Sequence, residues 1–248
     1  NYRILVISTS REDKVLENCF WKPKKTKKNL GLFGPNTNIA MEEGVDGLIK
    51  IMKSNKLAPE NITNYTKIVF KDRLEILQSY KGNSEEYKTI TNMYPDIINL
   101  ANNYYDLVLV DLDSNMNSYA VEKIIGASNL VVINLSQRLT SIDNFLEIKE
   151  KDAMFKAKKT LLLIGRYDKY SKYSIKNISR YMNEKNIVST IPYNTLFFEA
   201  AEEGKVPDLF LRLRKTVDED DRNGFFIAEV GRTVENIIYR LQNLQAKR

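Results

Sequence analysis

Residues 105–114 read YDLVLVDLDS and contain the clearest strand of this chain. The run 107–110 is continuously apolar and ends in Asp111, which is typical of a parallel strand buried on both faces. Other apolar runs lie before and after it, and segments with helical spacing separate them. This alternation predicts an α/β fold in which a mainly parallel sheet carries helices on both faces. Strands are expected at residues 3–9, 74–78, 107–111, 130–133, 160–164 and 187–191.

The segments between these strands predict helices, and the chain shows no repeat and no linker. We therefore expect one domain over residues 1–248. In the helical stretch expected at 84–104, Ser84 is the predicted N-cap and Pro95 is expected to kink or split the helix. Further helices are expected at residues 44–57, 118–126, 141–151, 173–184 and 195–203, and from near Gly224 onward.

The composition excludes several kinds of chemistry. The chain has no histidine and one cysteine, Cys19. It therefore has no histidine general base, no Ser-His-Asp triad, no histidine-ligated zinc and no disulfide within the chain. Carboxylates, hydroxyls, Lys/Arg and backbone amides remain, and phosphate-handling proteins work with that set. No apolar run approaches the length of a membrane span and the start does not resemble a signal peptide, so a cytoplasmic location is expected.

The formal net charge is +6, and the basic residues concentrate in WKPKKTKK at 21–28. Such a run is usually a solvated loop. It is also suited to contact with a nucleic-acid backbone or with lipid headgroups, and the sequence leaves these alternatives open. The residues concerned are Lys22, Lys24, Lys25, Lys27 and Lys28.

Residues that directly follow strands are candidates for a ligand site, because ligands of parallel sheets bind beyond the carboxyl ends of the strands. Asp111 ends its strand and could hold Mg²⁺ directly or through water, and Asp113 could share this role. The alternative for Asp111 is a helix cap or an acid of the loop. Arg166 could pair with Asp168 or with a ligand anion.

The last predicted strand of the sheet ends in Ile191-Pro-Tyr-Asn194. Pro192 fixes the direction in which the chain leaves the strand. Tyr193 could stack on a base or pack within the protein. None of these short tracts is specific by itself.

Four tracts follow one another along the chain: YDLVLVDLDS at 105–114, ASNLVVINLSQRLTSIDN at 127–144, LLLIGRYDKY at 161–170 and IPYNTLFFEAAEEGKVPDL at 191–209. In this order they give the chain a resemblance to the ParA/MinD superfamily of P-loop ATPases, over nearly its whole length. The resemblance implies binding of ATP and Mg²⁺, with Mg²⁺ at Asp111, and formation of a homodimer. It also implies a base pocket lined by Gly165, Arg166, Pro192, Tyr193 and Asn194.

The chain also departs from the family pattern. It contains no glycine-rich phosphate loop, and residues 2–10 resemble the family's second strand, so we expect the first strand and its loop to precede Asn1. Ser8 and Ser10 stand where the family has two aspartates, one of which helps to position water. Gly165 stands where the family has an asparagine that reads adenine. Hydrolysis is therefore expected to be slow or absent.

Three functions remain open at this point. The first is a positioning or partitioning ATPase that binds ATP-Mg and dimerises. The second is a non-hydrolysing scaffold of the same fold that binds a protein partner, of the pilus- or secretion-localising CpaE/TadZ type. The third is a partition factor that binds DNA nonspecifically. Membrane anchoring is disfavoured, because residues 240–248 carry two leucines and no aromatic residue.

Overall fold

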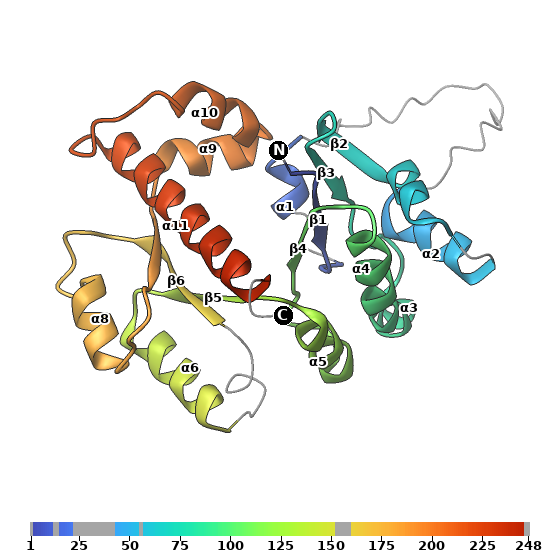
Figure 1. Cartoon of the computed structure of the whole chain (residues 1–248), viewed down its shortest axis with the longest axis horizontal. Coiled ribbons are helices and arrows are strands. Elements are labelled where there is room, and N and C mark those ends of the chain that lie inside the picture. Colours follow the sequence, from blue (N-terminus) through green and yellow to red (C-terminus); the bar gives the residue numbers. More distant parts are fainter. Residues whose placement is uncertain (1, 12–14, 22–42, 55–56, 152–159, 246–248) are drawn as a thin grey trace, which may run out of the picture. The chain divides into compact units, whose positions relative to one another are not determined.

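The computed structural model describes residues 2–11, 15–21, 43–54, 57–151 and 160–245. The chain divides into two compact units, which are described separately (Figure 1). The first comprises Asn1–Ile124 together with Ala201–Val206, and the second comprises Ile125–Ala200 and Pro207–Arg248. Both contain strands and helices, so the predicted α/β class is confirmed.

The first unit contains a four-stranded sheet with the order β2-β3-β1-β4. Strand β1 is parallel to β3 and to β4, and β2 is antiparallel to β3. Continuous apolar runs predicted β1 and β4, and β3 lies where a short strand was expected at 74–78. The bounds are Ile4–Ser8 for β1, Thr66–Phe70 for β2, Leu74–Leu77 for β3 and Leu107–Asp111 for β4.

The helices of the first unit largely follow the predicted segments. Pro95 lies in the first turn of α4, so the helical stretch is split there as predicted. The N-cap of α3 is Asn83, whose side chain accepts from the Glu86 N–H, and the prediction of Ser84 was wrong. The helices are α1 (Val15–Asn18), α2 (Gly44–Ser54), α3 (Ser84–Ile90) and α4 (Tyr94–Asn102), with 3₁₀ turns at Pro59–Asn64 and Thr91–Met93. Helix α5 (Ser118–Ala127) ends this part of the chain.

The second unit contains a three-stranded parallel sheet with the order β5-β6-β7. Helix α11 packs against β7. Helix α10 and strand β2 were not predicted. The strands are β5 (Val131–Ser136), β6 (Thr160–Tyr167) and β7 (Ser189–Pro192). The helices are α6 (Leu139–Lys151), α8 (Ile175–Tyr181), α9 (Thr195–Glu203), α10 (Val206–Leu213) and α11 (Arg222–Gln245).

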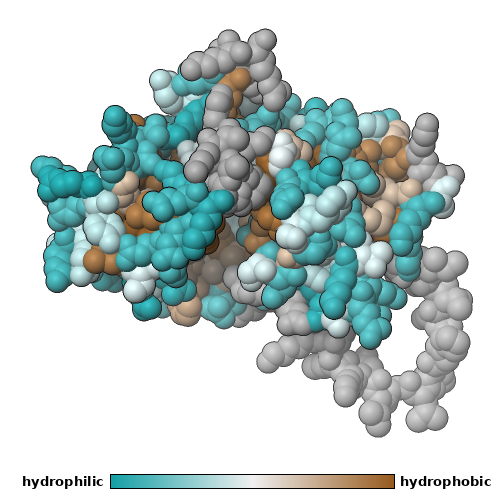
Figure 2. All heavy atoms as spheres, turned by 90° about the horizontal axis from the view of Figure 1, so that it is seen from below, coloured by the Kyte–Doolittle hydropathy of each residue, from teal (hydrophilic) through white to brown (hydrophobic). Residues whose placement is uncertain are grey.

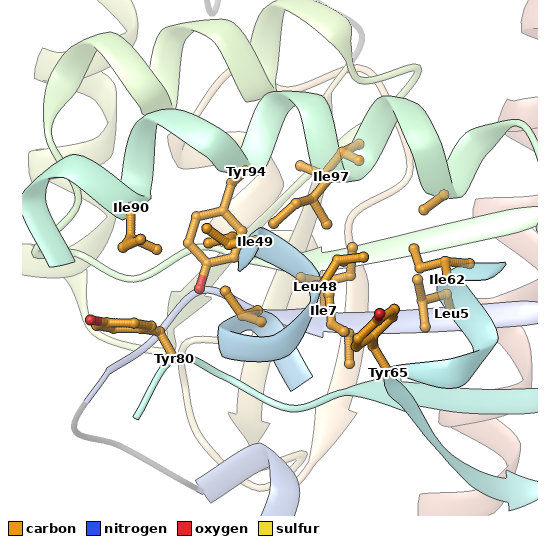
Figure 3. Packing of buried hydrophobic residues seen from close by; sticks show 14 of the residues in the cluster. Leu5, Ile7, Leu48, Ile49, Ile62, Tyr65, Tyr80, Ile90, Tyr94 and Ile97 are labelled. Carbon is orange, nitrogen blue, oxygen red and sulfur yellow. The ribbon is translucent and has the colours of Figure 1, made fainter. Parts of the chain in front are cut away.

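Each unit has its own apolar core. In the first unit, helices α2 and α4 pack on β1, and Figure 3 shows Leu48, Tyr94 and Ile97 gathered with Leu5 and Ile7 in this cluster. In the second unit, residues of β5 and β6 pack with residues of α6 and α8. The core of each unit packs against that unit's own sheet and so fixes the positions of its strand ends.

The face of the molecule in Figure 2 is mainly polar where its residues are coloured. Figure 2 shows hydrophilic residues over most of the face in view, with smaller hydrophobic areas between them. Among the described residues, no helix combines the length and the apolar character that crossing a membrane requires.

Candidate functional site

The carboxyl end of the four-stranded sheet collects hydroxyl and carboxylate groups. Ser8 ends β1 and pairs in register with Asp111, which ends β4. Ser8 and Ser10 are 2% and 9% exposed, and the Ser10 N–H donates to the Ser8 hydroxyl at 3.4 Å. Asp111 is exposed. The two serines are therefore buried at the end of β1, whereas Asp111, which pairs with Ser8 in the sheet, is an exposed residue.

Thr9 connects the ends of β1 and β4. Its hydroxyl donates to the Asp111 carbonyl oxygen at 2.9 Å and accepts from the Asp113 N–H at 2.8 Å. The Asp113 carboxylate in turn accepts from the backbone and side-chain N–H groups of Asn115. Thr9 thus fixes the backbone that leaves β4, and Asp113 is engaged within its own turn. From the sequence, the only indication that Thr9 belongs to this site is its position at the end of a predicted strand.

Asp111 can supply one carboxylate ligand to Mg²⁺. Among the described residues, no group of three or more Cys, Asp or Glu side chains is arranged to hold a metal ion. Mg²⁺ usually keeps several waters and binds through one or two carboxylates together with phosphate oxygens. A single exposed carboxylate at the end of β4 fits that mode of binding.

Glu17 is a buried carboxylate beside the end of β3, and no sequence pattern singles it out. It lies in α1 and is 5% exposed. It accepts from the Ser79 N–H at 2.7 Å, the Ser79 hydroxyl at 2.8 Å and the Gln78 side chain at 3.3 Å. These bonds attach α1 to the residues that follow β3. Glu17 therefore has a positional role at the same edge of the sheet.

Tyr87 closes this edge from α3. Its hydroxyl donates to the Thr9 carbonyl oxygen. Burial, and secondarily the negative charge of Asp113, raises the pKa of Tyr87 to about 12. Tyr87 is therefore a neutral hydrogen-bond donor at physiological pH.

The carboxyl end of the three-stranded sheet contains the other predicted residues. Gly165 in β6 pairs with Ser136 of β5 and Ile191 of β7. The ladder is irregular between Gly165 and Tyr167, and Arg166 between them has φ 52°. This left-handed conformation costs a residue other than glycine about 1–2 kcal/mol. Bulges of this kind redirect a side chain at a strand end, and Arg166 is exposed.

The residues after β7 have different environments. Pro192 is buried, and Tyr193 is half exposed with its N–H donating to the Tyr167 carbonyl oxygen at 3.2 Å. Asn194 is 3% exposed. Its side chain accepts from the Phe197 N–H and donates to Asn223, both at 2.9 Å. Asn194 thus caps the start of α9, and Tyr193 presents a ring to solvent.

A groove of about 590 Å³ runs along β5 and α6. Its lining is mainly apolar and includes Ile125, Val132, Phe145 and Ile148, with Arg138 among the polar residues. Strand β5 is the first strand of its sheet, so one of its edges has no neighbour among the described strands. None of the residues assigned to a site from the sequence lines this groove, although Ser136 and Arg138 follow the strand expected at 130–133.

The basic run is outside the described part of the chain. Lys22, Lys24, Lys25, Lys27 and Lys28 all lie in residues 22–42. Contact with DNA through them stays a prediction.

No protein-family model and no curated protein matches the sequence. Solved structures do match. A ParA family ATPase from Chlorobium tepidum TLS is 13% identical with a TM-score of 0.65, and the match covers 92% of this chain and 84% of that one. The cell division ATPase MinD of Pyrococcus furiosus is 13% identical with a TM-score of 0.60, over 95% and 86% of the chains. The septum site-determining protein MinD of Pyrococcus horikoshii OT3, complexed with Mg-ADP, is 11% identical with a TM-score of 0.57, over 96% and 85%.

These matches identify the fold. The chain has the fold of the P-loop ATPases of the ParA/MinD type, as the four sequence tracts predicted. The narrower resemblance to CpaE/TadZ-like proteins stays a prediction.

Proposed function

We propose that the protein is a ParA/MinD-like positioning or partitioning ATPase that binds ATP with Mg²⁺ and forms a homodimer in the cytoplasm. The single observation that supports this most is the exposed carboxylate of Asp111, at the end of a parallel strand paired with β1. The fold supports the same kind of protein, and one structure with this fold was determined with Mg-ADP. We further propose that residues 1–248 belong to one domain of this type.

In this proposal each site residue has a defined role. Asp111 holds Mg²⁺ directly or through water, and the ion neutralises charge on the phosphates. Gly165, Arg166 and Pro192 form one wall of the base pocket. Tyr193 stacks on the base through its exposed ring. Asn194 contributes through the backbone that it fixes, because its side chain is engaged in the cap of α9.

The test is calorimetric titration of the protein with ATP in the presence and absence of Mg²⁺. We expect binding with Mg²⁺ and a loss of its Mg²⁺ dependence in Asp111→Asn. Glu122→Gln removes an exposed carboxylate from α5 and should leave binding unchanged. Absence of ATP binding to the unaltered protein would refute the proposal.

A second candidate is a non-hydrolysing scaffold that binds a protein partner. It is favoured by the buried hydroxyls of Ser8 and Ser10, because a serine cannot replace a carboxylate in positioning water. Measuring phosphate release from bound ATP separates the two candidates. Binding without turnover would favour the scaffold, and steady turnover would favour the ATPase.

A further inference from the structure

Gly165 lies directly against a side chain from the neighbouring strand. A Cβ atom at position 165 would be 2.7 Å from Oδ1 of Asn134 and 3.4 Å from its Nδ2. A contact of 2.7 Å is too close for a packed protein, so any larger residue at 165 would displace the Asn134 carboxamide. The carboxamide therefore occupies the space in which a side chain from residue 165 would begin.

Asn134 is an uncommon residue for its position. Strand β5 reads VVINLS, and asparagine is depleted in strands. Its side chain lies on the same face as Val132 and Ser136, and all three residues are exposed. Among the described residues, none forms a hydrogen bond with this side chain. The carboxamide keeps a donor and an acceptor available near the carboxyl end of the strand.

The neighbouring residues make this a site rather than an isolated surface asparagine. Arg166 follows Gly165 in a left-handed conformation within the irregular ladder, and strained residues other than glycine concentrate at ligand sites. Tyr193 follows β7, on the other side of β6, with a half-exposed ring. An amide, a cation and an aromatic ring thus come from the ends of three adjacent strands.

We propose that Asn134 reads the base of the nucleotide, and that Gly165 provides the space for its carboxamide. This inference rests on the proposed nucleotide binding. A carboxamide can bond twice to adenine, accepting from N6 and donating to N7, whereas guanine presents two acceptors on the same edge. The site therefore prefers adenine nucleotides to guanine nucleotides.

The experiment compares MgATP and MgGTP by calorimetric titration. Asn134→Ala should reduce the preference for ATP about 5-fold to 150-fold, the range found for a two-bond contact to a base. Asn144→Ala removes an exposed carboxamide from α6 and is the matched control. The double variant Asn134→Ala/Gly165→Asn places a carboxamide on the adjacent strand β6 instead. In this variant the preference for ATP over GTP should recover. Circular dichroism of each variant verifies its fold.

The outcomes separate the two claims. If Asn134→Ala retains the preference for ATP, the base-reading role is wrong and the proposed nucleotide binding stands. An equal loss of ATP and GTP binding would also overturn the role, because it would indicate a structural effect. If the unaltered protein binds neither nucleotide, the proposed function fails and this inference fails with it.

Discussion

Gln137 and Asp168 exchange two hydrogen bonds. The Gln137 side chain accepts from the Asp168 N–H at 2.8 Å and donates to the Asp168 carbonyl oxygen at 3.1 Å. The same amide nitrogen lies 2.8 Å from the Tyr173 carbonyl oxygen. The Gln137 side chain therefore supplies hydrogen-bond partners to backbone groups of the loop after β6.

Gln137→Ala should release this loop. We expect faster amide hydrogen exchange at residues 168–173, because the Asp168 N–H loses its acceptor and two carbonyl oxygens lose a donor. Gln242→Ala, at an exposed position of α11, is the control and should leave the exchange of the loop unchanged. Unchanged exchange in Gln137→Ala would contradict the assigned role.

Thr9→Val should destabilise the first unit by about 1–2 kcal/mol, because valine has the shape of threonine without the hydroxyl that serves Asp111 and Asp113. Urea denaturation measures the difference. Thr9→Ser retains the hydroxyl and should recover most of the loss. If the serine and valine variants are equally unstable, packing of the methyl group and not the hydrogen bonds accounts for the effect.

Glu17→Ala should cost about 2–3 kcal/mol, since it leaves the Ser79 N–H and hydroxyl without an acceptor in a buried place. Glu17→Gln keeps one oxygen as an acceptor and should cost less. Denaturant titration of both variants tests the order. Because both variants lose the carboxylate charge, the reverse order would contradict the role assigned to the hydrogen bonds with Ser79.

Stability should fall at alkaline pH. Burial, followed by the hydrogen bond to Glu86 for Tyr80 and by the charge of Asp113 for Tyr87, raises both pKa values from 10.0 to about 12. Between these values the unfolded chain loses the two protons and the folded chain retains them. The free energy of unfolding is therefore highest below pH 10 and decreases as the pH approaches 12.

Denaturation at several pH values, followed together with tyrosinate absorbance, measures this decrease. Tyr87→Phe removes one of the buried tyrosines whose pKa is raised and should make the alkaline decrease less steep. Tyr2→Phe, at an exposed position, should leave the slope unchanged. An equal slope in all three proteins would contradict the assigned role of Tyr87.

Much of the fold could be predicted because its strands are continuous apolar runs. β1 and β4 are examples, and both lie where the hydrophobic pattern placed them. β2 was missed because a hairpin turn holds it on β3, with Asp72 at φ 58°, and its exposed Ile68 breaks the expected pattern. The N-cap of α3 was misplaced by one residue because Asn83 and Ser84 are both residues that cap helices.

The candidate site was predicted less completely. Residues that follow strands could be named from position alone, as Asp111 was. Thr9, Glu17 and Gln137 could not, because their partners lie far away in the sequence and only the tertiary structure brings them together. The relation of Asn134 to Gly165 also depends on which strands are neighbours, and one sequence does not show that.

The discontinuity of the first unit has a consequence during protein synthesis. Residues Ala201–Val206 belong to the unit formed by Asn1–Ile124, and the Val206 N–H donates to the Cys19 carbonyl oxygen at 3.1 Å. A ribosome must therefore translate the intervening stretch before this unit is complete, which takes roughly 4 to 15 s at typical elongation rates. During that interval the nascent chain exposes the surface that the later segment covers, and it is then open to chaperones and proteases.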